Sequence, residues 1–246
     1  MDAALRLELA AAEDRHWWFE GRRAILESLL ETFRLQPGST LLEAGCGNGA
    51  NLKLLARFGA VSAFEPDETD LGRAKRRDIG IVRSGRLPDG VPFDGERFDV
   101  VLSLDVIEHV QDDVAALAAL CARLGTGGRL VVTVPAFPFL WGEHDVRNGH
   151  HRRYTRMTLR RVLEDSGFRI DRLTHFNTLL FPAVALVRLL GRPFGLDAAG
   201  TGVPPSGVNG LLYRIFRSER RVIRLLSLPF GVSLLAIARP VGQAGS

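Results

Sequence analysis

Residues 41–55 have the sequence LLEAGCGNGANLKLL, in which a short apolar run leads into closely spaced glycines and then into an amphipathic segment. Glycine tolerates backbone angles that other residues avoid, so Gly45, Gly47 and Gly49 let the chain turn sharply and approach a ligand closely. A strand, a glycine turn and a helix in this order are typical of a nucleotide-cofactor site. The pattern also satisfies the dinucleotide fingerprint G-x-G-x-x-A through Gly45, Gly47 and Ala50, and a purely structural turn is a further alternative.

Around this stretch, short apolar runs alternate with amphipathic segments. We predict strands at 39–45, 60–66, 98–105, 127–136, 168–176 and 231–240. We predict helices at 50–59, 67–80, 112–125, 155–167, 178–190 and 209–228. Strands that alternate with helices form a parallel sheet with right-handed crossovers. The chain is therefore predicted to be a doubly wound α/β protein, whose ligands bind at the carboxyl ends of the strands.

The composition sets broad limits on the protein. The 246 residues carry a formal net charge of +4, which permits an anionic partner without requiring one. Cys46 and Cys121 match no metal or redox spacing, so we expect a reducing compartment. The N-terminal segment lacks a signal-peptide core, and the apolar run TLLFPAVALV at 178–187 is too short to span a bilayer. We expect a cytoplasmic protein that does not span the membrane.

The charge of Glu43 helps to choose between the cofactors. A carboxylate two residues before the first glycine would repel a pyrophosphate but would attract a cationic ligand. S-adenosylmethionine carries an ammonium and a sulfonium and has no phosphate. Glu65, at the end of the next predicted strand, fits a ribose-binding acid with either cofactor. Charge therefore favours S-adenosylmethionine over a nicotinamide dinucleotide.

The chain resembles the class I S-adenosylmethionine-dependent methyltransferases. Within that family it is similar to the bacterial group that includes the quinone-biosynthesis methyltransferases. The resemblance covers about residues 39–176 in the family's order and spacing. The motifs that carry it are LLEAGCGNGANLKLL (41–55), FEPD (64–67), FDVVLSLDVIEHVQD (98–112) and LGTGGRLVVTVPA (124–136).

The resemblance implies one methyltransferase domain over residues 1–246 with a mostly parallel, seven-stranded, Rossmann-like sheet. Its expected parts are an N-terminal helical lid (1–36), a cofactor-binding core (39–176), a helical insertion (177–230) and a final strand (231–240). It also implies an enzyme that methylates a small-molecule or lipid-linked acceptor, with oxygen as the favoured atom. A non-catalytic cofactor-binding or membrane-docking scaffold is an alternative. So is a nicotinamide-dependent reductase, although the chain has no catalytic Tyr-x-x-x-Lys pair.

The resemblance assigns cofactor-binding roles to matching residues. Those expected to wrap the methionine portion are Glu43, Ala44, Gly45, Cys46, Gly47 and Gly49. Glu65 would accept hydrogen bonds from the ribose hydroxyls, and Pro66 would pack near the adenine. Leu104 and Asp105 would lie beneath the sulfonium. Ser84 stands where many relatives have an acid near the adenine, and we expect it to contact the adenine amino group.

The N-terminal stretch HWWFEGRRAIL (16–26) resembles an element that recurs in one bacterial branch of the family. The resemblance suggests a helix that closes over the cofactor, with Trp18 and Arg22 among the cofactor-binding residues. Paired tryptophans more often pack a core than stack on a ligand, so packing is the alternative.

Two segments supply the candidate catalytic residues. His109 follows the strand at 98–105 and is a candidate general base. In the loop WGEHDVRNGHHRRYT (141–155), His144 with Asp145 is predicted to form a base and its orienting partner. The loop also carries Arg152 and Arg153, which are candidates for binding an acceptor carboxylate or phosphate.

The other interpretations of this loop are a solvated segment, a metal site and a nucleic-acid clamp. His144, Asp145, His150 and His151 could supply metal ligands, but their spacing matches no known pattern, so we expect no metal. The basic residues are confined to one loop, so we expect no nucleic-acid partner.

The predicted insertion holds an apolar helix at 178–190, a Gly/Pro-rich link at 191–207 and a basic amphipathic helix at 209–228. An amphipathic helix of this kind can lie on an anionic membrane, so peripheral membrane contact through 209–228 is one interpretation. It can also dock its apolar face on the protein, or wall a pocket for an isoprenoid or lipid-linked acceptor.

Overall fold

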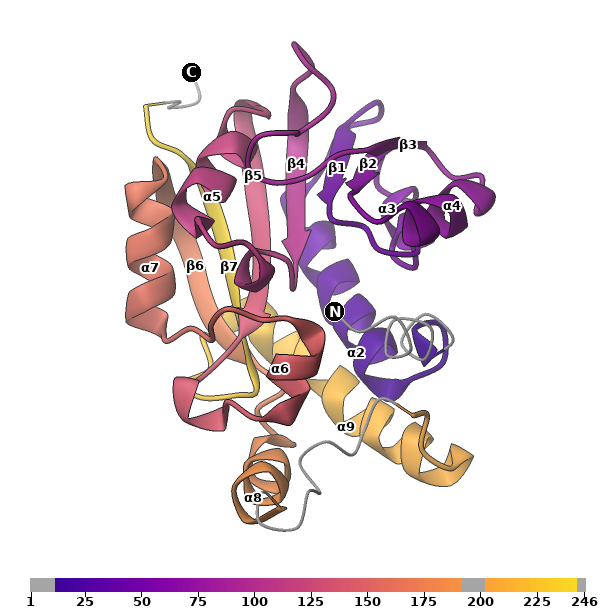
Figure 1. Cartoon of the computed structure of the whole chain (residues 1–246), viewed down its shortest axis with the longest axis vertical. Coiled ribbons are helices and arrows are strands. Elements are labelled where there is room, and N and C mark those ends of the chain that lie inside the picture. Colours follow the sequence, from indigo (N-terminus) through magenta and orange to yellow (C-terminus); the bar gives the residue numbers. More distant parts are fainter. Residues whose placement is uncertain (1–11, 192–201, 243–246) are drawn as a thin grey trace. The chain divides into compact units, whose positions relative to one another are not determined.

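The computed structural model of the chain describes residues 12–191 and 202–242 (Figure 1). The strands are β1 (Thr40–Ala44), β2 (Ala60–Glu65), β3 (Ile81–Ser84), β4 (Phe98–Leu104), β5 (Leu124–Pro135), β6 (Phe168–Phe176) and β7 (Ser233–Pro240). The α-helices are α2 (Trp17–Leu30), α3 (Leu52–Leu55), α4 (Glu68–Arg76), α5 (Asp113–Cys121), α6 (Glu143–Asn148), α7 (Arg156–Asp165), α8 (Phe181–Gly191) and α9 (Ser206–Leu225). Short 3-10 turns occur at η1 (Glu31–Phe33), η2 (Ile107–His109) and η3 (Pro138–Leu140).

The seven strands form one sheet in the order β3-β2-β1-β4-β5-β7-β6. The pairs β2–β3, β1–β2, β1–β4 and β4–β5 are all parallel, and β1, β2 and β4 lie side by side in Figure 1. The predicted doubly wound, mostly parallel sheet of seven strands is confirmed. The chain passes from the β3 edge back to β4 beside β1, so the loops after β1 and β4 meet at the point where the strand order reverses. Ligands of open α/β sheets bind at such a point.

The central strands are buried on both faces, as their nearly continuous apolar sequences predict. Every residue from Val100 to Leu104 in β4 is buried, and so is every residue from Leu41 to Ala44 in β1. The one strand that periodicity does not predict is β3. It lies at the sheet edge, and Ile81, Arg83 and Ser84 are exposed, so no buried apolar run marks it.

Several helices are shorter than predicted, because the chain leaves the helical conformation early. Asp67 caps α4 by accepting hydrogen bonds from the amides of Thr69 and Asp70, at 3.0 and 3.1 Å. The helix was predicted to continue to residue 80, but Asp78 and Gly80 have φ angles of 54° and 68°, which no α-helix contains. Residues 1–11 of the expected lid and most of the expected link at 191–207 lie outside the described residues.

The structure divides into two compact units. Among the described residues, unit 1 contains 12–33, 135–155, 174–191 and 202–234, and unit 2 contains 34–134, 156–173 and 235–242. Among the described residues, the predicted lid as far as Phe33 and the predicted insertion fall in unit 1, together with the loop after β5. The assignment of these parts to one functional domain stays a prediction, and each unit is described by itself below.

Unit 1 is organised by the packing of α2 against α9. A buried stripe of α9 carries Phe216, Glu219 and Ile223, at the spacing of one helical face. Gly21 leaves room for Phe216, because a Cβ at Gly21 would lie 2.3 Å from Phe216 Cδ1. Ser28 Oγ donates to the Arg220 carbonyl at 3.1 Å. The apolar face of α9 therefore docks on the protein, as one interpretation of the sequence predicted.

The structure also bears on membrane spanning. Within residues 12–191 and 202–242, no helix combines the length and apolarity that crossing a bilayer requires.

Candidate active site

The glycine loop after β1 is the centre of the candidate cofactor site in unit 2. Gly45, Gly47 and Gly49 have φ angles of 68°, 54° and 80°, in the left-handed region that favours glycine. At Gly45 a Cβ would lie 2.9 Å from Val106 Cγ2, and at Gly49 it would lie 3.1 Å from Ala74 Cα. At Gly47 no described atom would lie within 4 Å of an added Cβ. Packing therefore requires the outer glycines, whereas Gly47 presents its backbone to open space.

The amide groups of this loop are already hydrogen-bonded inside unit 2. Gly45 N and Cys46 N donate to the Phe64 carbonyl at 2.9 and 3.0 Å, and Gly49 N donates to the Cys46 carbonyl at 2.9 Å. Gly47 N donates to Glu65 Oε2 at 2.9 Å. A dinucleotide pyrophosphate needs backbone N–H donors from such a loop. These four amides are engaged elsewhere, so the loop is poorly suited to a pyrophosphate.

Two buried carboxylates lie beside the loop. Glu65, at the end of β2, also accepts from Asp67 N at 3.0 Å, through Oε1. A carboxylate oxygen accepts hydrogen bonds, which is the chemistry that ribose hydroxyls require of Glu65. Glu43 in β1 is 1% exposed, and its Oε1 accepts from Asn51 Nδ2 at 2.7 Å. Asn51 Oδ1 is buried and has no donor among the described residues. The surroundings of the loop are therefore rich in hydrogen-bond acceptors.

The remaining residues predicted for the cofactor in unit 2 lie at strand ends. Ala44 ends β1, Ser84 ends β3 in register with Glu65, and Leu104 ends β4. Asp105 has a φ of 56°, which is uncommon for a residue other than glycine. Its amide donates to the Thr133 carbonyl at 3.0 Å, and its Oδ1 accepts from Thr133 Oγ1 at 3.1 Å. These bonds fix the turn after β4.

Sequence reasoning missed Asn51 and Val106, which complete this site. Asn51 anchors Glu43, and Val106 packs on Gly45. A polar residue at the expected start of a helix gave a weak signal for Asn51, and nothing in the sequence marked Val106. Cys46 is buried in the loop and Pro66 is exposed beyond β2, where the resemblance places them.

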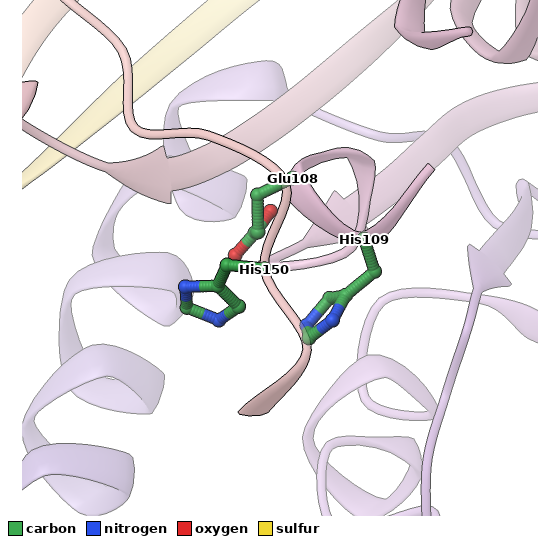
Figure 2. A group of neighbouring side chains, drawn as sticks. All are labelled: Glu108, His109 and His150. Carbon is green, nitrogen blue, oxygen red and sulfur yellow. The ribbon is translucent and has the colours of Figure 1, made fainter. Parts of the chain in front are cut away.

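The candidate histidines come from two segments. Figure 2 shows Glu108 and His109 on η2, and His150 on the segment that follows α6. Glu108 is fully buried, whereas His109 is partly exposed. His109 N donates to the Val106 carbonyl at 2.9 Å, which holds the turn after β4. The structure therefore places His109 one turn beyond Asp105 in unit 2.

In unit 1 the loop after β5 is built around the carboxylate of Asp145, which is fully buried. Its Oδ2 accepts from Gly142 N at 3.0 Å, and its Oδ1 lies 2.8 Å from both His150 Nδ1 and Arg153 Nε. Arg188 Nη1 lies 3.6 Å from Oδ2. Burial alone would raise the pKa of Asp145, but the hydrogen bonds from His150 and Arg153 and the charge of Arg153 hold it well below its usual range.

This arrangement corrects two expectations about the loop. The Asp145 carboxylate pairs with His150 and not with His144, because Gly149 has a φ of 70° and turns the chain back toward Asp145. Burial, and then the charge of Arg188, lower the pKa of His144 to about 3. His144 is therefore neutral and weakly basic at neutral pH. Arg153, expected to bind the acceptor, instead donates to Asp145 and, through Nη1, to the Ala136 carbonyl at 3.0 Å.

The hydrogen bond between His150 and Asp145 has a defined direction. Because Asp145 is ionised, its oxygen can only accept, so His150 Nδ1 is the donor. The same ion pairs disfavour the metal interpretation, since two arginines already neutralise the only carboxylate of the proposed ligand set.

Trp18 and Arg22 both lie on α2 in unit 1. The Trp18 ring stacks on Phe216 at 5.2 Å and on Phe176 at 5.9 Å between ring centroids. Arg22 is buried, and its Cζ lies 5.6 Å from the Phe19 ring centroid. The packing alternative accounts for Trp18, and cofactor contacts of both residues stay predictions.

A family model described as a methyltransferase domain matches residues 16–173. The chain belongs to this methyltransferase family. The ubiquinone biosynthesis O-methyltransferase of Methylobacterium nodulans is 34% identical over 120 residues, which are 46% of this chain and 44% of that protein. A probable S-adenosylmethionine-dependent methyltransferase of Mycolicibacterium smegmatis is 27% identical over 162 residues, 64% of this chain and 62% of that protein.

Solved structures share the fold. A chain of the complex between the Haloferax volcanii Trm112 methyltransferase activator and a methyltransferase has a TM-score of 0.63 at 17% identity, covering 99% of this chain and 97% of that one. Geranyl diphosphate C-methyltransferase from Streptomyces coelicolor A3(2), with bound S-adenosyl-L-homocysteine, has a TM-score of 0.59 at 18% identity, covering 88% and 78%. The fold is thus the Rossmann-like fold of class I S-adenosylmethionine-dependent methyltransferases. The chain spans about two fifths of the length of the first curated relatives that it matches.

The site of this chain fits the cofactor of the family, S-adenosylmethionine. The ligand offers donors, an ammonium and two ribose hydroxyls, and the loop offers buried acceptors on Glu43, Asn51 and Glu65. Gly47 leaves open space beside them. A dianionic pyrophosphate would meet two carboxylates and no available amide of the four described above.

Proposed function

We propose that the protein transfers the methyl group of S-adenosylmethionine to a small-molecule or lipid-linked acceptor, at oxygen. The observation that carries the cofactor part is the glycine loop. Four of its amides, those of Gly45, Cys46, Gly47 and Gly49, donate inside the protein, and buried carboxylates lie beside it. The oxygen part is supported by the curated relatives named ubiquinone biosynthesis O-methyltransferase, such as that of Methylobacterium nodulans.

S-adenosylmethionine, when bound, supplies an activated methyl group on a positively charged sulfur. Glu43, held by Asn51, would bind the ammonium, and Glu65 would bind the ribose hydroxyls while it keeps the glycine loop in place. Ser84 would contact the adenine, and Leu104 and Asp105 would line the sulfonium side of the site. Orientation and exclusion of water then provide most of the rate enhancement.

An oxygen acceptor must lose its proton, so a base is part of the proposal. His109 on η2 is the candidate in unit 2. In the loop after β5, His150 replaces His144 as the candidate, because an effective base has a pKa near the working pH and that of His144 is about 3. Asp145 orients His150 through Nδ1. Removal of either histidine would lower turnover without weakening cofactor binding.

The lipid-linked form of the acceptor connects to α9. Its basic sequence supports peripheral membrane contact through residues 209–228, as well as a location at the inner face of the membrane. We include Trp18 and Arg22 as cofactor-binding residues of the proposed lid.

The alternative is a scaffold that binds the cofactor and transfers nothing. The test measures S-adenosylhomocysteine formed from S-adenosylmethionine with a catechol, an isoprenylated phenol and a fatty acid as acceptors. Turnover with the phenols, lost in His109→Ala or His150→Ala and retained in the matched surface variant His151→Ala, supports O-methylation. Cofactor binding with no turnover on any acceptor would favour the scaffold.

A further inference from the structure

The side of α9 that faces away from α2 has an unusual composition. Arg214, Ser218, Arg221 and Leu225 follow one another at helical spacing, opposite the buried stripe of Phe216 and its neighbours, and all four are exposed. Leu225 is 81% exposed, although it is a large apolar residue. The outer side of α9 is therefore neither purely polar nor covered by described residues.

An apolar row borders this stripe. Its exposed members are Val208, Leu211, Val222 and Leu226. At about 100° per residue, these positions lie between the buried stripe and the arginines. A helix that only docks on the protein needs a single apolar face. Exposure of a second apolar row to water is unfavourable.

The charge of α9 is almost entirely of one sign. Its 20 residues include one acid, Glu219, and five arginines, at 214, 217, 220, 221 and 224. Glu219 is buried, and its Oε1 accepts from Leu179 N at 2.8 Å, so it does not offset the outer charges. Arg224 pairs with Glu31 at 3.0 Å. Arg214 and Arg221 form no ion pair with any described residue.

We propose that this outer face of α9, defined by Leu211, Arg214, Arg221, Val222 and Leu225, binds the surface of an anionic phospholipid bilayer. Arginine guanidinium groups bind phosphate through paired N–H donors, and the adjoining apolar row enters the boundary between headgroups and acyl chains. Arginine and leucine side by side on one helix face match that boundary, because the headgroups are charged and the acyl chains are apolar. The inference rests on the proposed function, since a lipid-linked acceptor would be met at such a surface.

The apolar row separates a bilayer from the other anionic partners. Free phosphate or an acidic polypeptide could pair with Arg214 and Arg221, but it would leave Leu211, Val222 and Leu225 exposed to water. A second copy of the chain would bring five more arginines against these five, which is unfavourable. A bilayer satisfies both features at once.

The experiment is flotation of the full chain with vesicles of phosphatidylcholine alone and of phosphatidylcholine with about one third phosphatidylglycerol. We expect binding to the anionic vesicles that weakens as salt is raised. Each arginine near an anionic surface contributes about fivefold to partitioning, so Arg214→Gln with Arg221→Gln lowers it about 25-fold. Leu211→Ser with Leu225→Ser lowers it by about tenfold or more, because less apolar surface enters the bilayer.

The matched control is Arg97→Gln with Arg161→Gln, two exposed arginines of unit 2 whose loss removes the same charge. It keeps nearly full binding if α9 is the contact. Equal loss in the control, no preference for anionic vesicles, or saturation of the site by inorganic phosphate would overturn the proposal. Calorimetric binding of S-adenosylmethionine by the α9 variants stays unchanged. Failure of the membrane proposal is therefore distinguishable from failure of the cofactor proposal.

Discussion

The buried carboxylate of Asp145 gives the sharpest prediction about unit 1. In Asp145→Asn the shape is conserved, but Arg153, whose side chain is 2% exposed, loses its counter-charge, and His150 loses an ionised acceptor. Breaking a buried ion pair from one side costs about 3–5 kcal/mol of unfolding free energy. For a chain of this size that corresponds to a fall in Tm of about 6–20 °C.

The assay is urea unfolding at neutral pH followed by circular dichroism, with Asp165→Asn as the matched control. Asp165 lies 3.6 Å from Arg161 at the surface, so its loss changes the unfolding free energy by at most about 1 kcal/mol. In Asp145→Asn with Arg153→Met the unpaired charge is removed as well, and part of the stability returns. A loss below about 1 kcal/mol in Asp145→Asn would refute the structural role given to this carboxylate.

Three further predictions concern a histidine and two glycines. The folded-state pKa of His144, about 3, lies below its unfolded value of 6.5, so its contribution is present above pH 6.5 and is lost as the pH falls toward 3. The slope is at most about 1.4 kcal/mol per pH unit, and urea unfolding at several pH values shows it flattened in His144→Gln. Gly21→Ala places a Cβ 2.3 Å from Phe216 Cδ1 and lowers the unfolding free energy by about 1–3 kcal/mol. In the control Gly72→Ala the added Cβ meets only Arg76 Nη1, at 3.6 Å, and raises the unfolding free energy by up to about 1 kcal/mol. Equal shifts of Tm in the two variants would contradict this. Gly49→Ala sets a Cβ 3.1 Å from Ala74 Cα and reduces binding of S-adenosylmethionine in calorimetry, whereas Gly38→Ala, which meets no described atom, preserves it.

The sequence predicts the sheet well, because burial on both faces leaves long apolar runs. It fails at β3, since an exposed edge strand of four residues needs no apolar side chains. The glycine loop is also predictable from sequence, because positive φ angles at Gly45, Gly47 and Gly49 favour glycine. The hydrogen bonds that its amides form inside the protein are not predictable from sequence, since they depend on where Glu65 and the Phe64 carbonyl lie.

The loop after β5 shows where sequence reasoning reaches its limit. His144 is the chain neighbour of Asp145, but adjacent residues of a helix point in different directions. Asp145 instead meets His150, five positions on, because α6 ends at Gly149 and the chain turns back. The same holds for α9. Its spacing predicts an apolar stripe, but only the structure shows that Phe216 of this stripe packs against Gly21 of α2.

The central claim is that the glycine loop and its carboxylates bind S-adenosylmethionine. The most direct measurement is isothermal titration of the protein with S-adenosylmethionine, S-adenosylhomocysteine and NADH in parallel. We predict affinities in the micromolar range for the first two and no binding of NADH. We also predict about tenfold or greater weakening in Glu65→Gln, with no change in the exposed neighbour variant Glu68→Gln. Binding of NADH alone, or equal affinity in Glu65→Gln, would contradict this account of the site.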